Sequence, residues 1–234
     1  MTRRRWIADR VEGNRAWLTG ANAEHLARVL RAKPGQQFDV AAEGVLRAAT
    51  IIAVSPEQVE FELGEPVPAS PLPEVSALLS IFKFDRFEWA IEKLTELGIA
   101  RIVPIISRRT DAHLAKAAEK RVERWRKIAR ESAQQARRIE PPEILSPTSL
   151  KDAVQGVNGC RIVLSEVEEA VSLKSALKSC ETPITLAFGP EGGWTQEELD
   201  LLKGAGWHAA SLGTTILRAE TAAIAAVAIV IAEP

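Results

Sequence analysis

Residues 184–198 decide the fold of this chain: Ile184-Thr185-Leu186-Ala187-Phe188, then Gly189-Pro190-Glu191-Gly192-Gly193, then Trp194 and Thr195-Gln196-Glu197-Glu198. The mostly apolar run before the glycines predicts a buried strand, and Thr195 with Glu198 has the capping-box spacing of a helix start. A strand, a glycine turn and a helix are typical of a parallel α/β sheet, which binds ligands at the carboxyl ends of its strands. The turn lacks the glycine pattern of a dinucleotide site and the Lys-Ser/Thr of a phosphate loop. The plainer interpretation is a tight connection between strand and helix.

Strand and helix patterns alternate from residue 76 onward, which predicts an α/β layer with a largely parallel sheet. The predicted strands are Ser76–Phe82, Ile102–Ile106, Arg161–Leu164, Ile184–Phe188 and Ala209–Leu212. The predicted helices are Arg86–Leu97, Ala115–Arg138, Leu173–Lys178, Gln196–Lys203 and Ala219–Ile231, and Asp85 with Glu88 repeats the capping-box spacing. The apolar stretch Ala222–Ala232 is well short of the ~18 residues that span a bilayer. It predicts a buried helix, and no membrane partner is expected.

A proline-rich segment marks the domain boundary. Residues 66–73, Pro-Val-Pro-Ala-Ser-Pro-Leu-Pro, favour a stiff extended spacer. The predicted strands before it are Arg5–Ala8, Ala16–Leu18, Phe38–Ala41, Leu46–Val54 and Val59–Leu63. One helix, Ala23–Leu30 with Asn22 as its cap, interrupts them. The first domain is therefore predicted as a small β-barrel, with domains at 1–68 and 74–234.

The composition excludes indiscriminate binding to polyanions. The 234 residues include 30 Lys and Arg against 31 Asp and Glu, a net charge of −1, so an anionic partner must meet a local patch. Cys160 and Cys180 stand outside any C-x-x-C pattern and away from histidine, so neither a metal site nor a disulfide framework is expected. This usage, with no signal peptide, favours the cytoplasm.

Ser211–Thr221 is a second candidate ligand segment, a strand end and glycine turn before the apolar helix. Together with the turn at 189–193 it predicts one pocket whose backbone groups hold a small polar ligand. Arg218 and Glu220 flank the apolar helix start. The plainer interpretation is that Glu220 complements the helix dipole and Arg218 pairs with it.

Two regions concentrate positive charge. Lys116–Arg138 carries nine Lys and Arg against three Glu, which favours a surface for a polyanion, although such a run is usually a solvated helix face. The N-terminus combines Arg3, Arg4 and Arg5 with Trp6 and Trp17. Arginine forks bind phosphate and indole rings stack on unpaired bases, which suits RNA; the plainer interpretation is that the two tryptophans are core residues.

Taken together, these motifs resemble the 16S ribosomal RNA uracil-N3 methyltransferases of the RsmE type. The likeness is carried by the segments Gly189–Glu198, Leu212-Gly213, Ile216-Leu217-Arg218, Glu220-Thr221-Ala222, Arg4-Arg5-Trp6, His25-Leu26, Val29-Leu30-Arg31 and Lys93–Ile99, with Arg108, Glu131, Gln135 and Arg138. The chain departs from the usual pattern at Ser132, Ala136 and Thr214-Thr215. Such an ordered set along most of the chain is far more specific than any one motif.

The resemblance implies an N-terminal PUA-like β-barrel and a C-terminal SPOUT α/β domain with a deep trefoil knot. It also implies a homodimer in which each site is completed by its neighbour. The implied S-adenosylmethionine contacts are Leu164, Glu166, Phe188, Gly189, Pro190, Glu191, Gly192, Gly193, Ser211, Leu212, Gly213, Ile216 and Leu217. The implied RNA contacts are Arg3, Arg4, Arg5, His25, Arg28, Arg31, Arg108, Arg137 and Arg138.

The implied reaction is methylation of N3 of one uridine near the decoding centre of 16S ribosomal RNA, in the assembled small subunit. Its chemistry needs cationic groups that stabilise the uracil oxygens, for which Arg218 and Arg138 are the candidates. Glu191 or Glu220 is the candidate base. The alternatives are a SPOUT methyltransferase that modifies another RNA base or a ribose, and an inactive ribosomal RNA-binding assembly protein.

Overall fold

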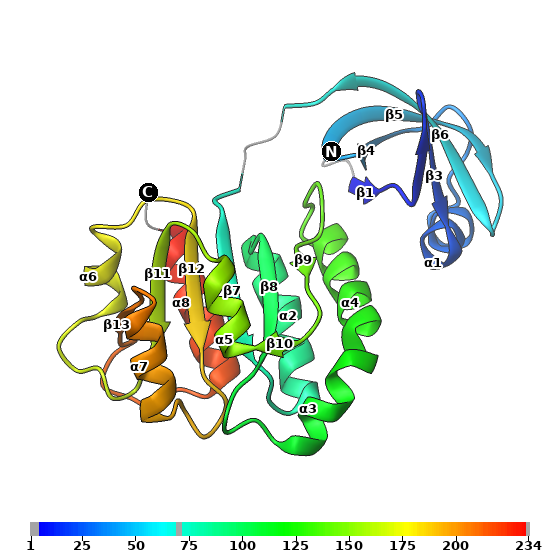
Figure 1. The fold of residues 1–234 in the computed structure, drawn as a ribbon. Coiled ribbons are helices and arrows are strands. Elements are labelled where there is room, and N and C mark those ends of the chain that lie inside the picture. Colours follow the sequence, from blue (N-terminus) through cyan, green and yellow to red (C-terminus); the bar gives the residue numbers. More distant parts are fainter. Residues whose placement is uncertain (1–4, 69–71, 233–234) are drawn as a thin grey trace. The chain divides into compact units, whose positions relative to one another are not determined.

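The computed structural model describes residues 5–68 and 72–232, drawn as a ribbon in Figure 1. Arg3, Arg4 and residues 69–71 of the predicted linker lie outside the described residues. The chain forms two compact units, residues 1–71 with 133–141, and residues 72–132 with 142–234. The segment 133–141 belongs with the first unit, although the sequence pattern continues the second unit's long helix to Arg138.

The first unit is built on one six-stranded sheet with the order β1-β4-β5-β6-β3-β2. Its strands are β1 (Arg5–Ile7), β2 (Arg10–Glu12), β3 (Arg15–Thr19), β4 (Gln37–Ala42), β5 (Val45–Val54) and β6 (Gln58–Pro66). The pairs are antiparallel except β1 with β4. On β6 the alternate residues Val59, Phe61 and Leu63 are buried, as a sheet with one face on a core requires. Within residues 5–68 no ladder joins β1 to β2, so the predicted barrel is not closed between these strands.

Between β3 and β4 the chain forms α1 (Gly20–Glu24) and a π-helical turn, η1 (His25–Val29). The predicted cap at Asn22 is wrong, because Thr19 with its extended backbone is the N-cap and Asn22 lies inside α1. Trp6 and Trp17 are 7% and 6% exposed, which confirms the interpretation of both as core residues. Neither ring offers a free face for stacking on a base.

The second unit is built on a parallel sheet, as predicted, with the order β10-β8-β7-β12-β11-β13 and β9 paired to β8. Its strands are β7 (Val75–Ser80), β8 (Arg101–Ile106), β9 (Glu143–Ile144), β10 (Thr148–Ser149), β11 (Cys160–Leu164), β12 (Ile184–Phe188) and β13 (His208–Ala210). β12 therefore lies between β7 and β11, in register from Val75 to Leu79 and from Cys160 to Leu164. This order brings the carboxyl ends of three strands side by side.

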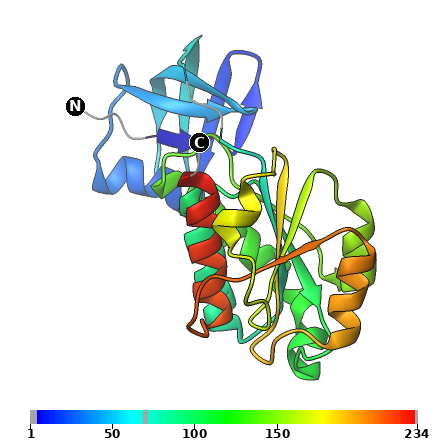
Figure 2. The ribbon, with the colours of Figure 1, turned by 90° about the vertical axis from the view of Figure 1, so that its left-hand side faces the viewer.

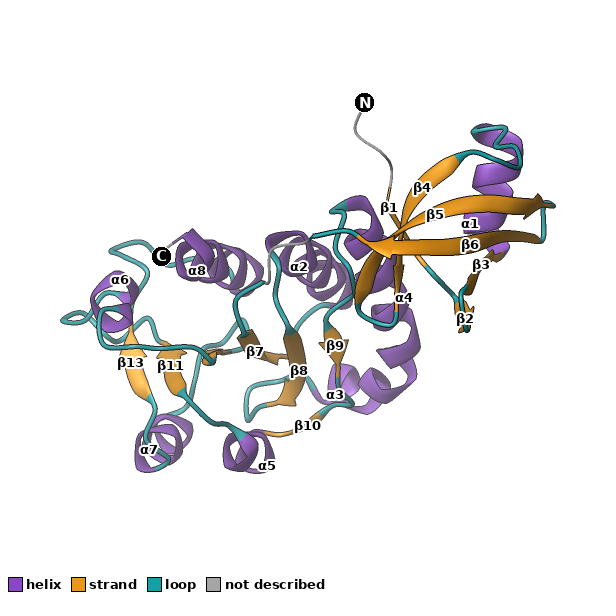
Figure 3. Cartoon of the chain, turned by 90° about the horizontal axis from the view of Figure 1, so that it is seen from above, coloured by secondary structure: helices purple, strands orange, loops and turns teal. Residues whose placement is uncertain are grey.

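Helices cover both faces of this sheet. They are α2 (Phe84–Leu97), α3 (Ala112–Ala118), α4 (Val122–Gln135), α5 (Leu150–Ala153), α6 (Leu173–Leu177), α7 (Gln196–Gly204) and α8 (Ala219–Ala232), with short 3₁₀ turns η2 (Glu119–Arg121) and η3 (Val154–Gly156). Figure 3 shows α2, α6 and α8 on one face and α5 and α7 on the other. The main core lies beneath α2 and α8, around Phe87, Trp125 and Leu186.

Two predicted helix features are wrong. The single helix Ala115–Arg138 is divided by η2 into α3 and α4, and it ends at Gln135. At the start of α2, the N-cap is Lys83 and no side chain caps the helix. The Glu88 carboxylate instead accepts two hydrogen bonds from Arg124, both of 2.8 Å, so it is unavailable for the predicted capping box. The capping box of Thr195 and Glu198 at α7 is confirmed.

The last helix and the cysteines complete the second unit. Figure 2 shows the orange segment after β13 running across to the start of α8, which packs against α2, β7 and β12. No helix within residues 5–68 and 72–232 has the length and apolar character to cross a membrane. Cys160 and Cys180 form a disulfide, contrary to the prediction. Cys160 is the first residue of β11, and Cys180 follows α6. The chain after α6 passes close to the start of β11, so the two Cα atoms lie 5.4 Å apart.

Candidate active site

A cavity of about 380 Å³ opens where the chain leaves β11, β12 and β13. Its size falls within the range of about 300–1,000 Å³ usual for small-molecule sites. Its lining residues come from the ends of parallel strands and the loops that follow them, and from the first turns of α2, α7 and α8. They are Arg86, Leu164–Val167, Phe188–Glu191, Gly193, Trp194, Leu199, Ser211–Gly213, Thr215–Ala219 and Ala222.

The structure brings the predicted ligand segments together in this one cavity. Twelve of the thirteen predicted contacts line it: Leu164, Glu166, Phe188, Gly189, Pro190, Glu191, Gly193, Ser211, Leu212, Gly213, Ile216 and Leu217. Gly192 is not among the lining residues. A Cβ on Gly192 would lie 3.2 Å from Cδ of Arg109, so this glycine makes room for an arginine and not for a ligand.

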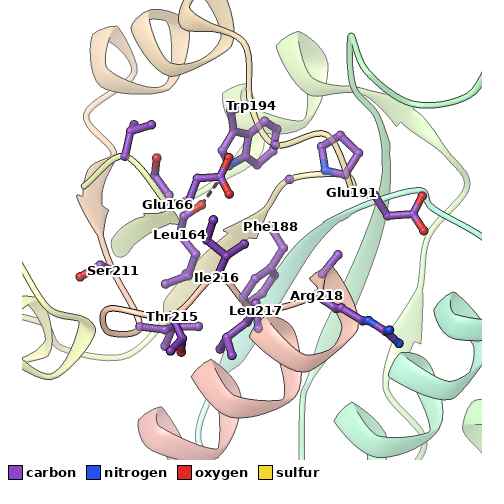
Figure 4. Close-up of a pocket in the computed structure, with 18 of the residues that line it drawn as sticks. Leu164, Glu166, Phe188, Glu191, Trp194, Ser211, Thr215, Ile216, Leu217 and Arg218 are labelled. Carbon is purple, nitrogen blue, oxygen red and sulfur yellow. Dashed lines mark hydrogen bonds between the residues drawn. The ribbon is translucent and has the colours of Figure 1, made fainter. Parts of the chain in front are cut away.

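The indole of Trp194 fixes the glycine turn against β11. Its Nε1 donates to the carbonyl of Leu164 over 3.0 Å, the contact dashed in Figure 4. The turn closes on itself through the amide of Gly193, which donates to the carbonyl of Pro190 over 2.8 Å. Because Trp194 is only 9% exposed, this indole bond is shielded from competing water. One buried side chain thus links two of the three predicted ligand segments.

Replacing Trp194 with phenylalanine is expected to lower the free energy of unfolding by about 1–3 kcal/mol beyond the loss of area, since the Leu164 carbonyl loses a buried partner. Urea unfolding followed by circular dichroism measures it. The matched control is Trp207→Phe, because Trp207 is buried and its Nε1 has no hydrogen-bond partner among the described residues. Equal losses in the two variants would contradict the assigned role of the Trp194 bond.

Charged side chains at the cavity differ in how they are paired. Arg86, on α2, lies 3.5 Å from Glu191 and 3.8 Å from Glu220. Glu220 has a side chain only 5% exposed and does not line the cavity, whereas the Glu191 side chain is 41% exposed. Arg218 lines the cavity, is exposed, and forms no ion pair within the described part of the chain. The predicted pairing of Arg218 with Glu220 is therefore wrong, and Arg218 is available to an anion.

Figure 4 shows Glu191 and Arg218 toward the same side of the cavity.

Several predicted RNA contacts meet in the first unit. Arg5 donates to the carbonyl of Arg137 over 2.7 Å, across 132 positions of sequence. Arg28 is exposed and pairs with Glu24 at 3.0 Å, and Arg31 is exposed with a positive φ of 50°. His25 begins η1, with its ring 6.1 Å from that of Trp6. Residues 133–141 thus bring Arg137 to the Arg-rich start.

Arg138, predicted both as an RNA contact and as a catalytic group, also belongs to the first unit. Its side chain is buried, with 8% exposed, and this burial lowers its pKa while the charge of Glu140 acts in the opposite direction. It is not among the residues that line the cavity. The position fits a structural role better than a contact with substrate.

Four of the nine basic residues at 116–138 form ion pairs with neighbouring glutamates. Arg121 and Arg124 both pair with Glu88, and Arg126 pairs with Glu123 at 2.6 Å. Lys127 lies 3.8 Å from Glu131. The plainer interpretation, a solvated helix face, therefore fits these four residues.

Among the residues at the site that the sequence reasoning missed, three make contacts that shape it or carry charge. Arg86 and Trp194 line the cavity, and Arg109 donates to the glycine turn from outside it. Arg86 and Arg109 follow β7 and β8, and the position of those strands beside β12 cannot be deduced without the sheet order. Trp194 had a local signal, because a tryptophan directly after a glycine turn is a natural packing partner for it.

Comparisons with known proteins agree with this geometry. Residues 68–231 match the family described as an RNA methyltransferase domain, and residues 18–64 match an RNA methyltransferase PUA domain. The ribosomal RNA small subunit methyltransferase E of Synechocystis is 34% identical, over 90% of this chain and 71% of its own length. The protein of the same name from Bacillus subtilis is 31% identical, over 88% and 85%.

A solved structure supports the same relation. The ribosomal RNA small subunit methyltransferase E of Neisseria gonorrhoeae, bound to S-adenosylmethionine, superposes with a TM-score of 0.84 and 25% identity, covering 97% of this chain and 96% of its own. The loops that line the cavity, the two matched domains and the identity to full-length relatives lead to one conclusion. This chain belongs to the RNA methyltransferase family that includes the ribosomal RNA small subunit methyltransferase E proteins.

Proposed function

We propose that this chain methylates N3 of one uridine in 16S ribosomal RNA, near the decoding centre, with S-adenosylmethionine as methyl donor. The observation that carries the proposal is the cavity, in which the loops after three parallel strands meet. The names of the relatives and the cofactor bound by the Neisseria protein support the reaction class and the donor. We place the reaction in the cytoplasm, on the assembled small subunit.

The residues at the cavity fit this cofactor. Phe188, Leu212 and Leu217 supply apolar surface for a purine ring, and Glu166 supplies a negative charge for a cationic ligand. The glycine turn allows close approach to the backbone, since a Cβ on Gly193 would come within 3.0 Å of Oε1 of Glu166. S-adenosylmethionine, when bound, supplies an electrophilic methyl group on a sulfonium.

The chain must then stabilise negative charge on the uracil ring and accept the N3 proton. Arg218 is suited to the first task because it lines the cavity and its guanidinium has no ion pair within the described residues. Glu191 is better suited than Glu220 to accept the proton, since Glu191 is accessible and Glu220 is buried. Arg86 lies within ion-pair distance of both carboxylates. Because N3 is a Watson–Crick donor, the uridine must be unpaired or extruded when it reacts.

The two domains share the work in this proposal. Residues 1–68 form the PUA-like domain, and residues 74–234 form the SPOUT methyltransferase domain with its trefoil knot. The proposed RNA surface combines Arg5, His25, Arg28 and Arg31 of the first domain with Arg137, whose segment 133–141 belongs to the same compact unit. Arg108, which is exposed and lies 3.9 Å from Glu197, is the predicted contact in the second domain.

We further propose a homodimer that completes the cavity. Ile216 and Val167 line the cavity and are 82% and 71% exposed, unusually high for large apolar side chains. The helix α8 is apolar on every side, yet Ile224, Ala225 and Ala228 remain only partly buried in the single chain. A second copy of the chain would cover both features.

The function is tested by nucleoside mass spectrometry of 16S ribosomal RNA from a strain that lacks the gene. We expect N3-methyluridine to disappear, and to return when the purified chain and S-adenosylmethionine are added to small subunits from that strain. Retained N3-methyluridine would contradict the proposed position. Loss of a different modified nucleoside would favour the alternative RNA target. No lost nucleoside and no cofactor binding by calorimetry would favour the inactive assembly protein.

A further inference from the structure

The loop between β8 and α3 contacts the glycine turn through Arg109. From this loop, Arg109 Nη1 donates to the carbonyl of Gly192 and, over 3.3 Å, to that of Trp194. Arg109 does not line the cavity, whereas Trp194 and Gly193 do. One guanidinium nitrogen therefore binds two carbonyls in the last part of the turn.

This loop is itself held in one conformation. The hydroxyl of Thr110 accepts from the amide of Ser107 over 3.1 Å and lies 2.9 Å from the Ser107 hydroxyl. The amide of Arg108 donates to Oε1 of Glu198 over 2.8 Å. Because the loop is bonded at both places, Arg109 projects from a fixed base and not from a freely moving segment.

Glu198 connects this base to the helix that follows the turn. It is only 6% exposed, and its second oxygen accepts from the amide and the hydroxyl of Thr195, over 2.9 and 3.1 Å. Glu198 thus caps α7 with one oxygen and holds the β8–α3 loop with the other. One buried carboxylate therefore joins the β8–α3 loop to the start of α7.

The missing side chain at Gly192 is a separate indication. A Cβ there would lie 3.2 Å from Cδ of Arg109, which is tighter than ordinary van der Waals contact, and 3.5 Å from Cβ of Arg109. The stem of Arg109 therefore packs directly on the Cα of Gly192. Since Gly192 does not line the cavity, its small size serves Arg109.

We propose that Arg109 is a positioning residue for the cofactor: it fixes the carbonyls of Gly192 and Trp194 and thereby the shape of the turn that binds S-adenosylmethionine. This inference rests on the proposed function, because it assumes that the cavity binds that molecule. The two hydrogen bonds orient peptide units whose neighbours face the ligand. Without them the turn samples other shapes, and the ligand must order it on binding.

Calorimetric titration with S-adenosylmethionine tests the proposal. Arg109→Ala is expected to raise the dissociation constant about tenfold, the loss expected for charged hydrogen bonds in a partly exposed site. Arg109→Lys, which keeps the positive charge and several donors on one nitrogen but loses the planar guanidinium that places Nη1 between the two carbonyls, should recover part of the affinity. The control is Arg101→Ala at the other end of β8, whose surface ion pair with Glu143 is remote from the turn; it should bind like the wild type.

A double-mutant cycle separates this role from a general loss of stability. Gly192→Ala alone should weaken binding a few-fold, because its Cβ displaces the Arg109 stem. In the Arg109→Ala background the same change should have almost no effect, so the two losses are not additive. Additive losses, or wild-type affinity in Arg109→Ala, would overturn the proposal.

Two further outcomes are distinguishable. If Arg109 contacts RNA instead, Arg109→Ala will weaken binding of small subunits and leave the cofactor dissociation constant unchanged, which also overturns the proposal. If the wild-type chain itself binds no S-adenosylmethionine, the proposed function fails and not merely the role of Arg109. Should Arg109→Ala unfold, the Arg109→Lys and Gly192→Ala variants carry the same test.

Discussion

Replacing Arg218 with alanine is expected to lower the single-turnover rate of methyl transfer by about 10²–10³-fold, the usual loss when one group that stabilises developing negative charge is removed. The affinity for S-adenosylmethionine should change little. Arg218 lines the cavity, and its guanidinium has no carboxylate partner within the described residues. A cation without an internal partner interacts with charge that develops on the substrate without first breaking an ion pair.

Rapid-quench kinetics with labelled cofactor and small subunits measures the rate, and calorimetry measures cofactor affinity. Arg218→Lys serves as the matched variant, since it keeps the charge but loses the planar fork that matches two oxygens; an intermediate rate is expected. An unchanged rate in Arg218→Ala would remove this residue from the mechanism. A dissociation constant that rises as much as the rate falls would show that Arg218 binds the cofactor instead.

The sequence predicted the ligand segments well because each carries its own local signal. Ile184–Phe188 with the following glycines predicts a strand that ends at a turn, and Ser211–Thr221 repeats the pattern. Parallel strands present their carboxyl ends at one edge, so the expectation that both turns line one cavity follows from general rules of sheet geometry. The predicted family adds Leu164 and Glu166 to the same set.

The site residues that the sequence did not predict depend on which strands are neighbours in the sheet. Arg86 reaches the cavity because β7 lies beside β12, and Arg109 reaches the turn from the loop after β8. Neither adjacency is encoded in local periodicity. The contact of Gly192 with Arg109 was missed for the same reason, since the spacing of Gly192 within the turn is like that of Gly193.

Charge is the property that sequence patterns described least well. The run at 116–138 has a positive excess along the chain, yet Glu88, from the separate helix α2, binds both Arg121 and Arg124. The same glutamate was predicted to cap its own helix. A side chain has one conformation at a time, and a bidentate arginine is a stronger partner than a single backbone amide.

Replacing Gly193 with valine is expected to raise the dissociation constant for S-adenosylmethionine by about 100-fold or more, because two unfavourable effects coincide. The backbone of Gly193 has φ of +70°, a conformation that costs a β-branched residue roughly 1–3 kcal/mol. A Cβ at this position would also lie 3.0 Å from Oε1 of Glu166, inside the cavity lining. Either Glu166 or the turn must therefore give way, and both line the cavity.

The control for backbone strain is Gly206→Val in the same unit. Gly206 has φ of +78°, close to that of Gly193, but it does not line the cavity, and a Cβ there would lie 3.9 Å from its nearest neighbour, Cζ of Arg161. Both variants should have a lower free energy of unfolding in urea. Only Gly193→Val should also have a higher dissociation constant for S-adenosylmethionine. If the two variants bind S-adenosylmethionine equally well, the glycine turn is needed for folding alone and the ligand lies elsewhere. A selective loss in Gly193→Val instead assigns the turn to the cofactor, because strain common to both glycines cannot account for a difference between them.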